Sequence, residues 1–356
     1  MRTPLFVLIW AIVGLALYLV FEIFGNDYLF FAGYIVLQYI VLATAWNILG
    51  GYCGYVNFGS AGFFALGAYS GVFLYTVGQG VDDFGTEGFG ALMHLIFPVP
   101  VPIIIVIGGI VAGLVGLGTG YLTLRLRGVF FAIATLALAV VLETLVVNWS
   151  YVGGSRGAYI IPPSEIPIFG PYVQFLFALM IVLVIVALTS ARLIERSRLG
   201  YGFATIRDDE LAAEACGVPT LRLKLIATTI SGALMGMAGA PFPFYIGYVE
   251  PASAFNLSYA VNAIAMPMIG GTTSWIGPLV GAVLLGSLQQ LATVTISSAA
   301  NLLIVGLLLI AFVIVAPNGI VGLVQGWWRK RSANTPTKTS TTSSAKPSTT
   351  SGEAKP

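Results

Sequence analysis

The stretch from Tyr28 to Leu49 reads YLFFAGYIVLQYIVLATAWNIL and contains no charged side chain. The hydrocarbon core of a bilayer is about 30 Å thick, and a helix needs about 20 apolar residues to cross it. This stretch has that length and that composition. It therefore predicts a transmembrane helix, and the rest of the chain shows whether that helix stands alone.

Comparable apolar runs recur along the whole chain. The further predicted spans are Leu5–Val20, Ala61–Val77, Leu95–Leu122, Val129–Trp149, Tyr172–Ala191, Leu225–Tyr248, Tyr259–Ile269, Ile276–Ile296 and Leu302–Val324. Only 8% of the residues are charged, whereas soluble domains have about 25%. The sequence predicts an all-α integral membrane protein with about ten transmembrane helices. The first run is expected to be an uncleaved anchor rather than a signal peptide, and the short run before Gly270 a span or a re-entrant segment.

Lys and Arg are concentrated on one side of these predicted spans. Cytoplasmic loops carry an excess of both residues. An inside N-terminus places nearly all of them in the cytoplasm, namely Arg125, Arg127, Arg192, Arg196, Arg198, Arg207, Arg222, Lys224, Arg329, Lys330 and Arg331. The other side receives Arg156 and the acids Asp82, Asp83 and Glu87. Both termini are therefore expected to be cytoplasmic.

We expect a transmembrane domain over residues 1–326 and a disordered Ser/Thr/Pro/Lys tail over 327–356. The net charge of +2 gives no indication of a nucleic-acid partner.

Two glycine-rich segments interrupt the apolar runs, Gly50–Ser60 and Ile269–Pro278. Transporters use broken helices to direct free backbone groups at their substrate. The candidate residues for a translocation path are Asn57, Ser60, Gly270, Gly271 and Thr272. Both segments are equally compatible with tight cytoplasmic turns. Small residues at i, i+4, such as Gly232 and Gly236, instead predict close helix packing.

Glu143 is the one acid well inside an apolar run. Ionisable residues at membrane depth are costly and are often functional. Glu143 is therefore a further candidate for the path or a gate. The alternative is that its side chain extends to the outer interface, since Asn148 and Trp149 follow closely.

The longest hydrophilic segment runs from Arg192 to Lys224 and is expected to contain a short helix from Asp208 to Ala215. Asp208 is a plausible N-cap, and Gly217 follows the expected end of the helix. Leu211 and Ala215 share one face at i, i+4. Such a helix needs a partner at the cytoplasmic surface, unless it lies flat on the lipid headgroups.

Several motifs in this chain resemble those of one family of transport proteins. They are Glu210–Gly217 with Ser197–Gly200 and Arg207–Asp208 before it, Gly51–Gly54 through Tyr69, Leu124–Leu136, Gly153–Gly157, and Gly270–Ala282. In this order they resemble the permeases of branched-chain amino acid ABC transporters. The chain looks more like the second, longer permease of the pair than the first.

The resemblance implies a permease subunit of an importer in the inner (cytoplasmic) cell membrane. The implied partners are two ATPase subunits, a second permease and an external binding protein that delivers Leu, Ile or Val. It assigns ATPase coupling to Arg207, Asp208, Asp209, Glu210, Leu211, Glu214 and Gly217. The family commonly has a histidine where this chain has Ser60, and related permeases carry urea or short amides, which leaves that substrate class as an alternative.

No nucleotide-binding motif G-x-x-x-x-G-K-[ST] occurs in the sequence, so ATP hydrolysis is expected to reside in separate subunits. Cys53, Cys216 and His94 show no metal-ligand spacing, and we expect no catalytic residue, metal or cofactor. An ion-coupled secondary transporter is the main alternative of another class, but it would need more ionisable residues in its spans. A membrane enzyme or a channel is a weaker alternative.

Overall fold

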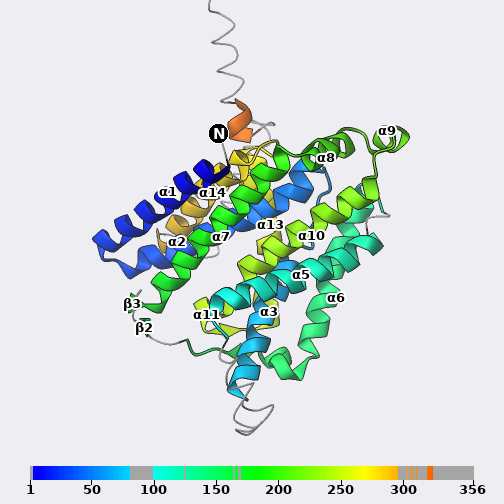
Figure 1. The fold of residues 1–356 in the computed structure, drawn as a ribbon. Coiled ribbons are helices and arrows are strands. Elements are labelled where there is room, and N and C mark those ends of the chain that lie inside the picture. Colours follow the sequence, from blue (N-terminus) through cyan, green and yellow to red (C-terminus); the bar gives the residue numbers. More distant parts are fainter. Residues whose placement is uncertain are drawn as a thin grey trace, which may run out of the picture.

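The computed structural model describes residues 3–80, 99–123, 126–162, 165–166 and 170–295, and residues 303, 306–307, 310 and 319–323 besides. Within these ranges the chain is a bundle of helices (Figure 1). Eight of the described helical segments are long and apolar enough to cross a membrane. The prediction of an all-α, multi-pass membrane protein is therefore confirmed.

The helices have the following bounds. They are α1 (Thr3–Phe24), α2 (Asp27–Asn47), the π-helical turn η1 (Ile48–Tyr52), α3 (Ser60–Gln79), α5 (Val101–Thr123), α6 (Val129–Val147), the 3-10 turns η3 (Ser150–Val152) and η4 (Gly154–Arg156), α7 (Tyr172–Glu195), α8 (Arg198–Asp208), α9 (Glu210–Ala215), α10 (Thr220–Gly239), α11 (Phe242–Ile246), α12 (Pro251–Ala254), α13 (Leu257–Gly270) and α14 (Ile276–Thr295). Two short antiparallel ribbons accompany them. One pairs β1 (Ala158–Tyr159) with β4 (Tyr248–Val249), and the other pairs β2 (Glu165–Ile166) with β3 (Gly170–Pro171).

The predicted count of ten spans is not reproduced in the described part of the chain. α13 has 14 residues, and a helix of that length falls short of the about 20 residues that a span needs. The predicted span Leu225–Tyr248 begins earlier, at Thr220, and α10 gives way to α11 beside Pro241. The predicted span Leu302–Val324 lies largely outside the described residues. So do the tail 327–356, the acids Asp82, Asp83 and Glu87, and Arg125.

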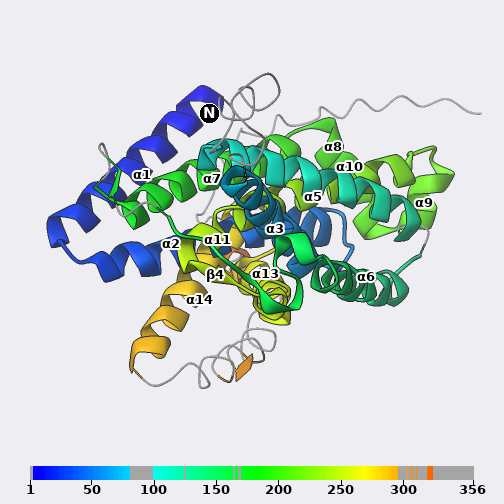
Figure 2. The ribbon, with the colours of Figure 1, turned by 90° about the horizontal axis from the view of Figure 1, so that it is seen from below.

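α2 forms the centre of the bundle, and the outermost helices lie to either side of it. Nearly every residue from Ile40 to Leu49 is buried. α1 and α6 lie on opposite sides of the bundle in both views (Figures 1 and 2). Both expose many apolar side chains, as helices that face lipid do. The start of α1 lies at the same end of the bundle as α8 and α9 (Figure 1).

Glycines allow α10 to approach α3 and α5 closely. A Cβ on Gly236 would lie 2.4 Å from Cβ of Ala112, and one on Gly67 would lie 1.9 Å from the carbonyl oxygen of Gly236. Helices in a membrane associate through such close van der Waals packing, because lipid tails are as apolar as the side chains they replace. The packing role predicted for Gly232 and Gly236 is confirmed.

Candidate functional site

The first glycine-rich segment is a buried break between α2 and α3. The backbone passes through the π-helical turn η1 and is irregular over residues 53–59. The Tyr55 amide donates to the Leu49 carbonyl at 3.2 Å, and the Trp46 indole N–H donates to the Asn57 carbonyl at 2.9 Å. Irregular backbone at membrane depth persists only where protein or a cavity surrounds it. Most of this segment is buried, although Gly54 and Val56 are exposed, so it is not a simple exposed turn.

The two polar candidates in this segment are both almost fully buried. Asn57 and Ser60 are each 1% exposed. The Asn57 side-chain oxygen accepts a hydrogen bond from the Gly59 amide at 2.8 Å. The Ser60 hydroxyl makes no hydrogen bond to any residue that the structure describes. A buried hydroxyl without a partner is uncommon and costly, so Ser60 retains a free donor and acceptor in the core.

The second glycine-rich segment lies between α13 and α14. Gly271 ends α13 with a φ of +118°, a conformation that residues with a side chain rarely adopt. A Cβ on Gly270 would lie 1.8 Å from the carbonyl oxygen of Gly277, so the first turn of α14 packs directly on the end of α13. Thr272 follows this junction and is part of the connection itself.

The two segments meet at the α8–α9 end of the bundle. A Cβ on Gly51 would lie 2.7 Å from the carbonyl oxygen of Thr272. The Glu195 carboxylate, at the end of α7, accepts hydrogen bonds from the Tyr52 hydroxyl at 3.5 Å and from the Trp275 amide at 3.0 Å. The structure therefore brings together the segments that hold five of the six candidate path residues, although they are far apart in sequence.

Glu143 lies apart from these residues. The hydroxyl oxygen of Thr135, on the same helix α6, accepts a hydrogen bond from the Phe58 amide at 3.2 Å. This bond marks the place where α6 contacts the first glycine-rich segment. Glu143 lies eight positions further along α6, about 12 Å at 1.5 Å per residue. Its side chain is half-buried. The structure does not bring it to the glycine-rich segments.

The predicted cytoplasmic helix Asp208–Ala215 corresponds to α9, and a second helix that was not predicted, α8, precedes it with a bend between them. The expected start at Asp208 is wrong, because Asp208 is the last residue of α8. Asp209 adopts an extended conformation and its carboxylate accepts the Ala212 amide at 3.0 Å, so Asp209 caps α9. An N-cap side chain bonds the amide two or three residues ahead of it, and only Asp209 has the extended backbone that this requires.

The predicted end of α9 is confirmed. Gly217 has a φ of +82°. The Gly217 amide bonds the Glu214 carbonyl at 2.9 Å, and the Val218 amide bonds the Ala213 carbonyl at 3.0 Å. A glycine in the left-handed region satisfies the last carbonyls of a helix in this way.

Charged side chains join α9 to its neighbours. The Lys224 ammonium lies 2.6 Å from a Glu210 carboxylate oxygen, with the two side chains 3% and 13% exposed. It also lies 3.2 Å from the Tyr55 hydroxyl, which donates to the other Glu210 oxygen. Arg127 bonds the exposed Glu214 at 3.0 Å. Arg207 packs against Gly54, where a Cβ would lie 2.9 Å from its Cγ.

This environment changes the proton affinity of the groups around Glu210. Burial alone would raise the pKa of the Glu210 carboxyl group, but hydrogen bonds from Lys224 and Tyr55 and the charges of Lys224 and Arg127 bring that pKa below its usual value. Burial, with Glu210 next to it, raises the pKa of the Tyr55 hydroxyl. Glu210 is therefore ionised and Tyr55 protonated at neutral pH.

Sequence reasoning missed Tyr55 as a site residue and took Lys224 for a loop charge. Lys224 instead lies within α10 and is buried. No spacing rule links residues 55, 210 and 224, because only tertiary packing brings them together. The one signal in the sequence was the position of Lys224. It directly precedes an apolar run and has no acidic neighbour in sequence, which is consistent with a partner from elsewhere in the chain.

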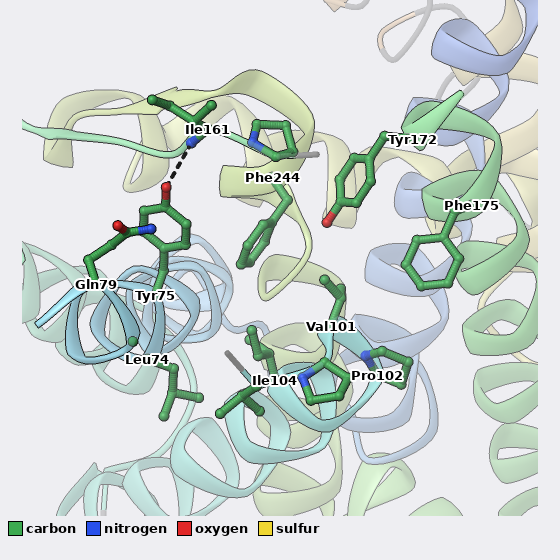
Figure 3. A pocket seen from close by; sticks show the side chains of 14 residues that line it. Leu74, Tyr75, Gln79, Val101, Pro102, Ile104, Ile161, Tyr172, Phe175 and Phe244 are labelled. Carbon is green, nitrogen blue, oxygen red and sulfur yellow. Dashed lines mark hydrogen bonds between the residues drawn. The ribbon is translucent and has the colours of Figure 1, made fainter. Parts of the chain in front are cut away.

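A cavity of about 760 Å³ lies among the ends of α3, α5, α7 and α11 (Figure 3). Its lining is mainly apolar, including Leu74, Val101, Phe175 and Phe244. The Tyr75 hydroxyl accepts the Ile161 amide at 3.2 Å at one side of it. This cavity is at the start of α5 and of α7, away from the α8–α9 end, and none of the candidate residues lines it.

The fold defines a polytopic membrane protein, and comparison with known sequences identifies its family. The profile of the family described as "Branched-chain amino acid transport system / permease component" matches residues 28–313. The chain belongs to this family of transport permease components.

Its relatives include permease proteins named LivM and LivH. The high-affinity branched-chain amino acid transport system permease protein LivM of Escherichia coli (strain K12) is 27% identical over 82% of this chain and 69% of its own length. LivM of Salmonella typhimurium is 27% identical over 81% of this chain and 68% of its own length. The probable branched-chain amino acid transport permease LivH of Methanocaldococcus jannaschii is 25% identical over 64% and 75%. The likeness to the longer permease that the motifs suggested is therefore confirmed. No solved structure matches the chain.

Proposed function

We propose that this chain is a permease subunit of an ATP-binding cassette importer and forms part of the translocation path for leucine, isoleucine and valine. The observation that carries the proposal is the α8–α9 segment, a capped pair of helices that projects from one end of a permease of this family. The chain has no nucleotide-binding motif of its own. An ATP-driven permease needs a rigid surface on which a separate ATPase can act, and α8–α9 is such a surface.

The exposed face of α9 supports docking of a partner. Leu211 is 64% exposed, and Ala212 and Ala215 are exposed with it. Ala213 is buried and Glu210 is held by Lys224, so α9 is fixed to the bundle by its other face. An apolar side chain held outward on a fixed helix is typical of the anchors of protein interfaces. The coupling residues Arg207, Asp208, Asp209, Glu210, Leu211, Glu214 and Gly217 all belong to this segment.

The remaining partners follow from the family. Relatives named LivM and LivH support a second, homologous permease beside this one. Two ATPase subunits would occupy the α8–α9 end, and an external binding protein would deliver substrate at the opposite end. The excess of Lys and Arg supports a cytoplasmic location for α8–α9 and for both termini in the cell membrane. The buried Asn57 and Ser60, with Gly270, Gly271 and Thr272, are the proposed contribution to the path. Glu143, about two turns beyond Thr135 on α6, is proposed as a separate gate residue.

Substrate identity is tested by reconstituted transport. The permeases, ATPases and binding protein are assembled in vesicles, and uptake of labelled leucine is measured with and without ATP. We expect ATP-dependent uptake that unlabelled valine suppresses and urea does not. Suppression by urea but not valine would replace the amino acids with the urea and short-amide class. Uptake that follows an imposed ion gradient without ATP would overturn the proposal in favour of a secondary transporter.

A further inference from the structure

Three side chains from distant parts of the chain form a buried cluster under α9. Glu210 opens α9, Lys224 lies in α10, and Tyr55 belongs to the first glycine-rich segment. The Lys224 ammonium lies 2.6 Å from Glu210 and 3.2 Å from the Tyr55 hydroxyl, and it is 4.7 Å from the centre of the Tyr55 ring. The Tyr55 hydroxyl donates to Glu210. Each residue thus contacts both of the others.

Burial distinguishes this cluster from the ion pair beside it. Lys224 and Tyr55 are 3% and 7% exposed. The pair Arg127–Glu214 is 49% and 41% exposed, and exposed pairs contribute little because water and salt screen them. A buried charge that loses its partner is costly. Glu210, Lys224 and Tyr55 are therefore constrained to stay together when α9 moves, whereas the exposed Arg127, which also lies 3.7 Å from Glu210, is free to separate from Glu214.

Tyr55 connects this cluster to the buried backbone of the first segment. Its amide bonds the Leu49 carbonyl at 3.2 Å, and its ring meets Phe131 of α6 edge-on at 5.1 Å. Asn57 follows two residues later and is bonded to Trp46 through its carbonyl. A displacement of α9 that pulls on the Tyr55 hydroxyl is therefore passed directly into the segment that holds Asn57 and Ser60.

We propose that Glu210, Lys224 and Tyr55 form the joint that transmits movement of α9 to the first glycine-rich segment. The proposal rests on the proposed function, since it assumes that an ATPase acts on α9. All three are positioning residues, because none is expected to touch substrate. Lys224 holds the Glu210 carboxylate at the start of α9, and the Tyr55 hydroxyl carries the displacement onward. No sequence spacing predicts this arrangement.

The native cysteine Cys53 can report this movement through its rate of chemical labelling. Cys53 lies in the first segment, two residues from Tyr55, and is 0% exposed. Burial raises the pKa of the Cys53 thiol to about 12, so a maleimide reacts slowly with it while the segment is closed. Cys216, at the end of α9, is exposed and would react first. The Cys216→Ser chain therefore isolates the signal from Cys53.

The experiment measures the rate of maleimide labelling of Cys53 in the assembled complex, with and without ATP. In the Cys216→Ser parent, we expect ATP to accelerate labelling. Tyr55→Phe keeps the ring, its contact with Phe131 and its place beside Lys224, but removes the hydroxyl. Without ATP, we expect this variant to be labelled at the rate of the parent. With ATP, we expect the increase in the labelling rate to be smaller by about tenfold or more, which is the loss expected for a hydrogen bond to a charged group.

Two further variants complete the test. The double change Lys224→Met with Glu210→Gln removes both charges together, so that neither is left buried alone, and it should lose the ATP response as Tyr55→Phe does. Arg222→Gln removes an exposed charge from the same turn of α10 and should retain the full response. A full ATP response in Tyr55→Phe would overturn the joint while the proposed function stands. Failure of the parent to retain the ATPase subunits would overturn the proposed function itself, and the joint with it.

Discussion

Gly51 and Thr272 meet backbone to backbone, since a Cβ on Gly51 would lie 2.7 Å from the Thr272 carbonyl oxygen. This contact joins the two glycine-rich segments at the end of the bundle where α8 and α9 project. Glu195 reinforces it by accepting hydrogen bonds from Tyr52 and Trp275. The two breaks in the helical pattern therefore form one structural unit, rather than two separate turns.

We predict that Gly51→Ala destabilises the protein by about 1–3 kcal/mol, the range for overpacking a filled site. The added methyl group would lie 1.9 Å from Asn47 Oδ1 and 2.7 Å from the Thr272 carbonyl oxygen, and that carbonyl belongs to the backbone and cannot swing aside. Gly118→Ala is the matched control, because Gly118 lies inside α5 and a Cβ there would meet nothing within 4 Å. Alanine in a helix interior is preferred over glycine by about 0.5–1 kcal/mol. Thermal unfolding of both variants in one detergent measures the difference, and equal midpoints would contradict the tight contact.

Close approaches of this kind lie beyond what the sequence can predict. Gly51 and Thr272 each belong to a segment that the sequence marked as unusual, but composition does not say that the segments touch. Likewise, Asp208 and Asp209 are the same residue type at neighbouring positions, so the sequence does not show which of them is the N-cap of α9. The extended backbone of Asp209 follows from the bend between α8 and α9, which depends on how α8 packs against α7 and α10. The long spans were predictable because their length and apolarity are dictated by the bilayer alone.

We predict that Gly217→Val weakens ATP coupling and that Gly217→Asn does so much less. Valine at a φ of +82° is strained by about 1–2 kcal/mol, whereas asparagine tolerates the left-handed region at helix ends. A Cβ at this position would meet nothing within 4 Å, so any effect arises from the backbone and not from a clash. The measurement is ATP hydrolysis in response to loaded binding protein. Equal responses from the two variants would show that the end of α9 is not critical.

We predict that Glu143→Gln lowers transport while the ATPase subunits still co-purify. Glu143 is half-buried on α6, away from α8 and α9, so its loss should not disturb docking. Removing a charge at membrane depth should, if anything, ease insertion. Thr144→Val serves as the control, since the exposed Thr144 hydroxyl donates to the Val140 carbonyl of its own helix and to no residue outside that helix in the described part of the chain. Unchanged uptake with Gln would mean that Glu143 extends to the outer interface and has no part in the path.

We predict that the stabilising effect of Glu210 disappears in acid. Its pKa is lowered in the folded protein by Lys224, Tyr55 and Arg127. A carboxyl group with a lowered folded-state pKa stabilises fully above its unfolded value, about 4.3, and loses that contribution as the pH falls through the lower folded value. The difference in thermal midpoint between the parent and Glu210→Gln should therefore be constant from neutral pH to about pH 5 and should shrink below about pH 4. A difference that shrinks already near neutral pH would contradict the assignment.

The exposed Leu211 lies on the proposed docking surface of α8–α9 for a separate ATPase. The measurement is the amount of ATPase subunit that co-purifies with the permease carrying Leu211→Asp, compared with the parent and with Leu211→Met. An aspartate buried unpaired in an apolar contact is costly, whereas methionine keeps the size and apolarity of leucine. We predict that Leu211→Asp inserts normally and loses the ATPase, and that Leu211→Met retains it. Retention of the ATPase by Leu211→Asp at the parent level would show that α9 is not the docking surface.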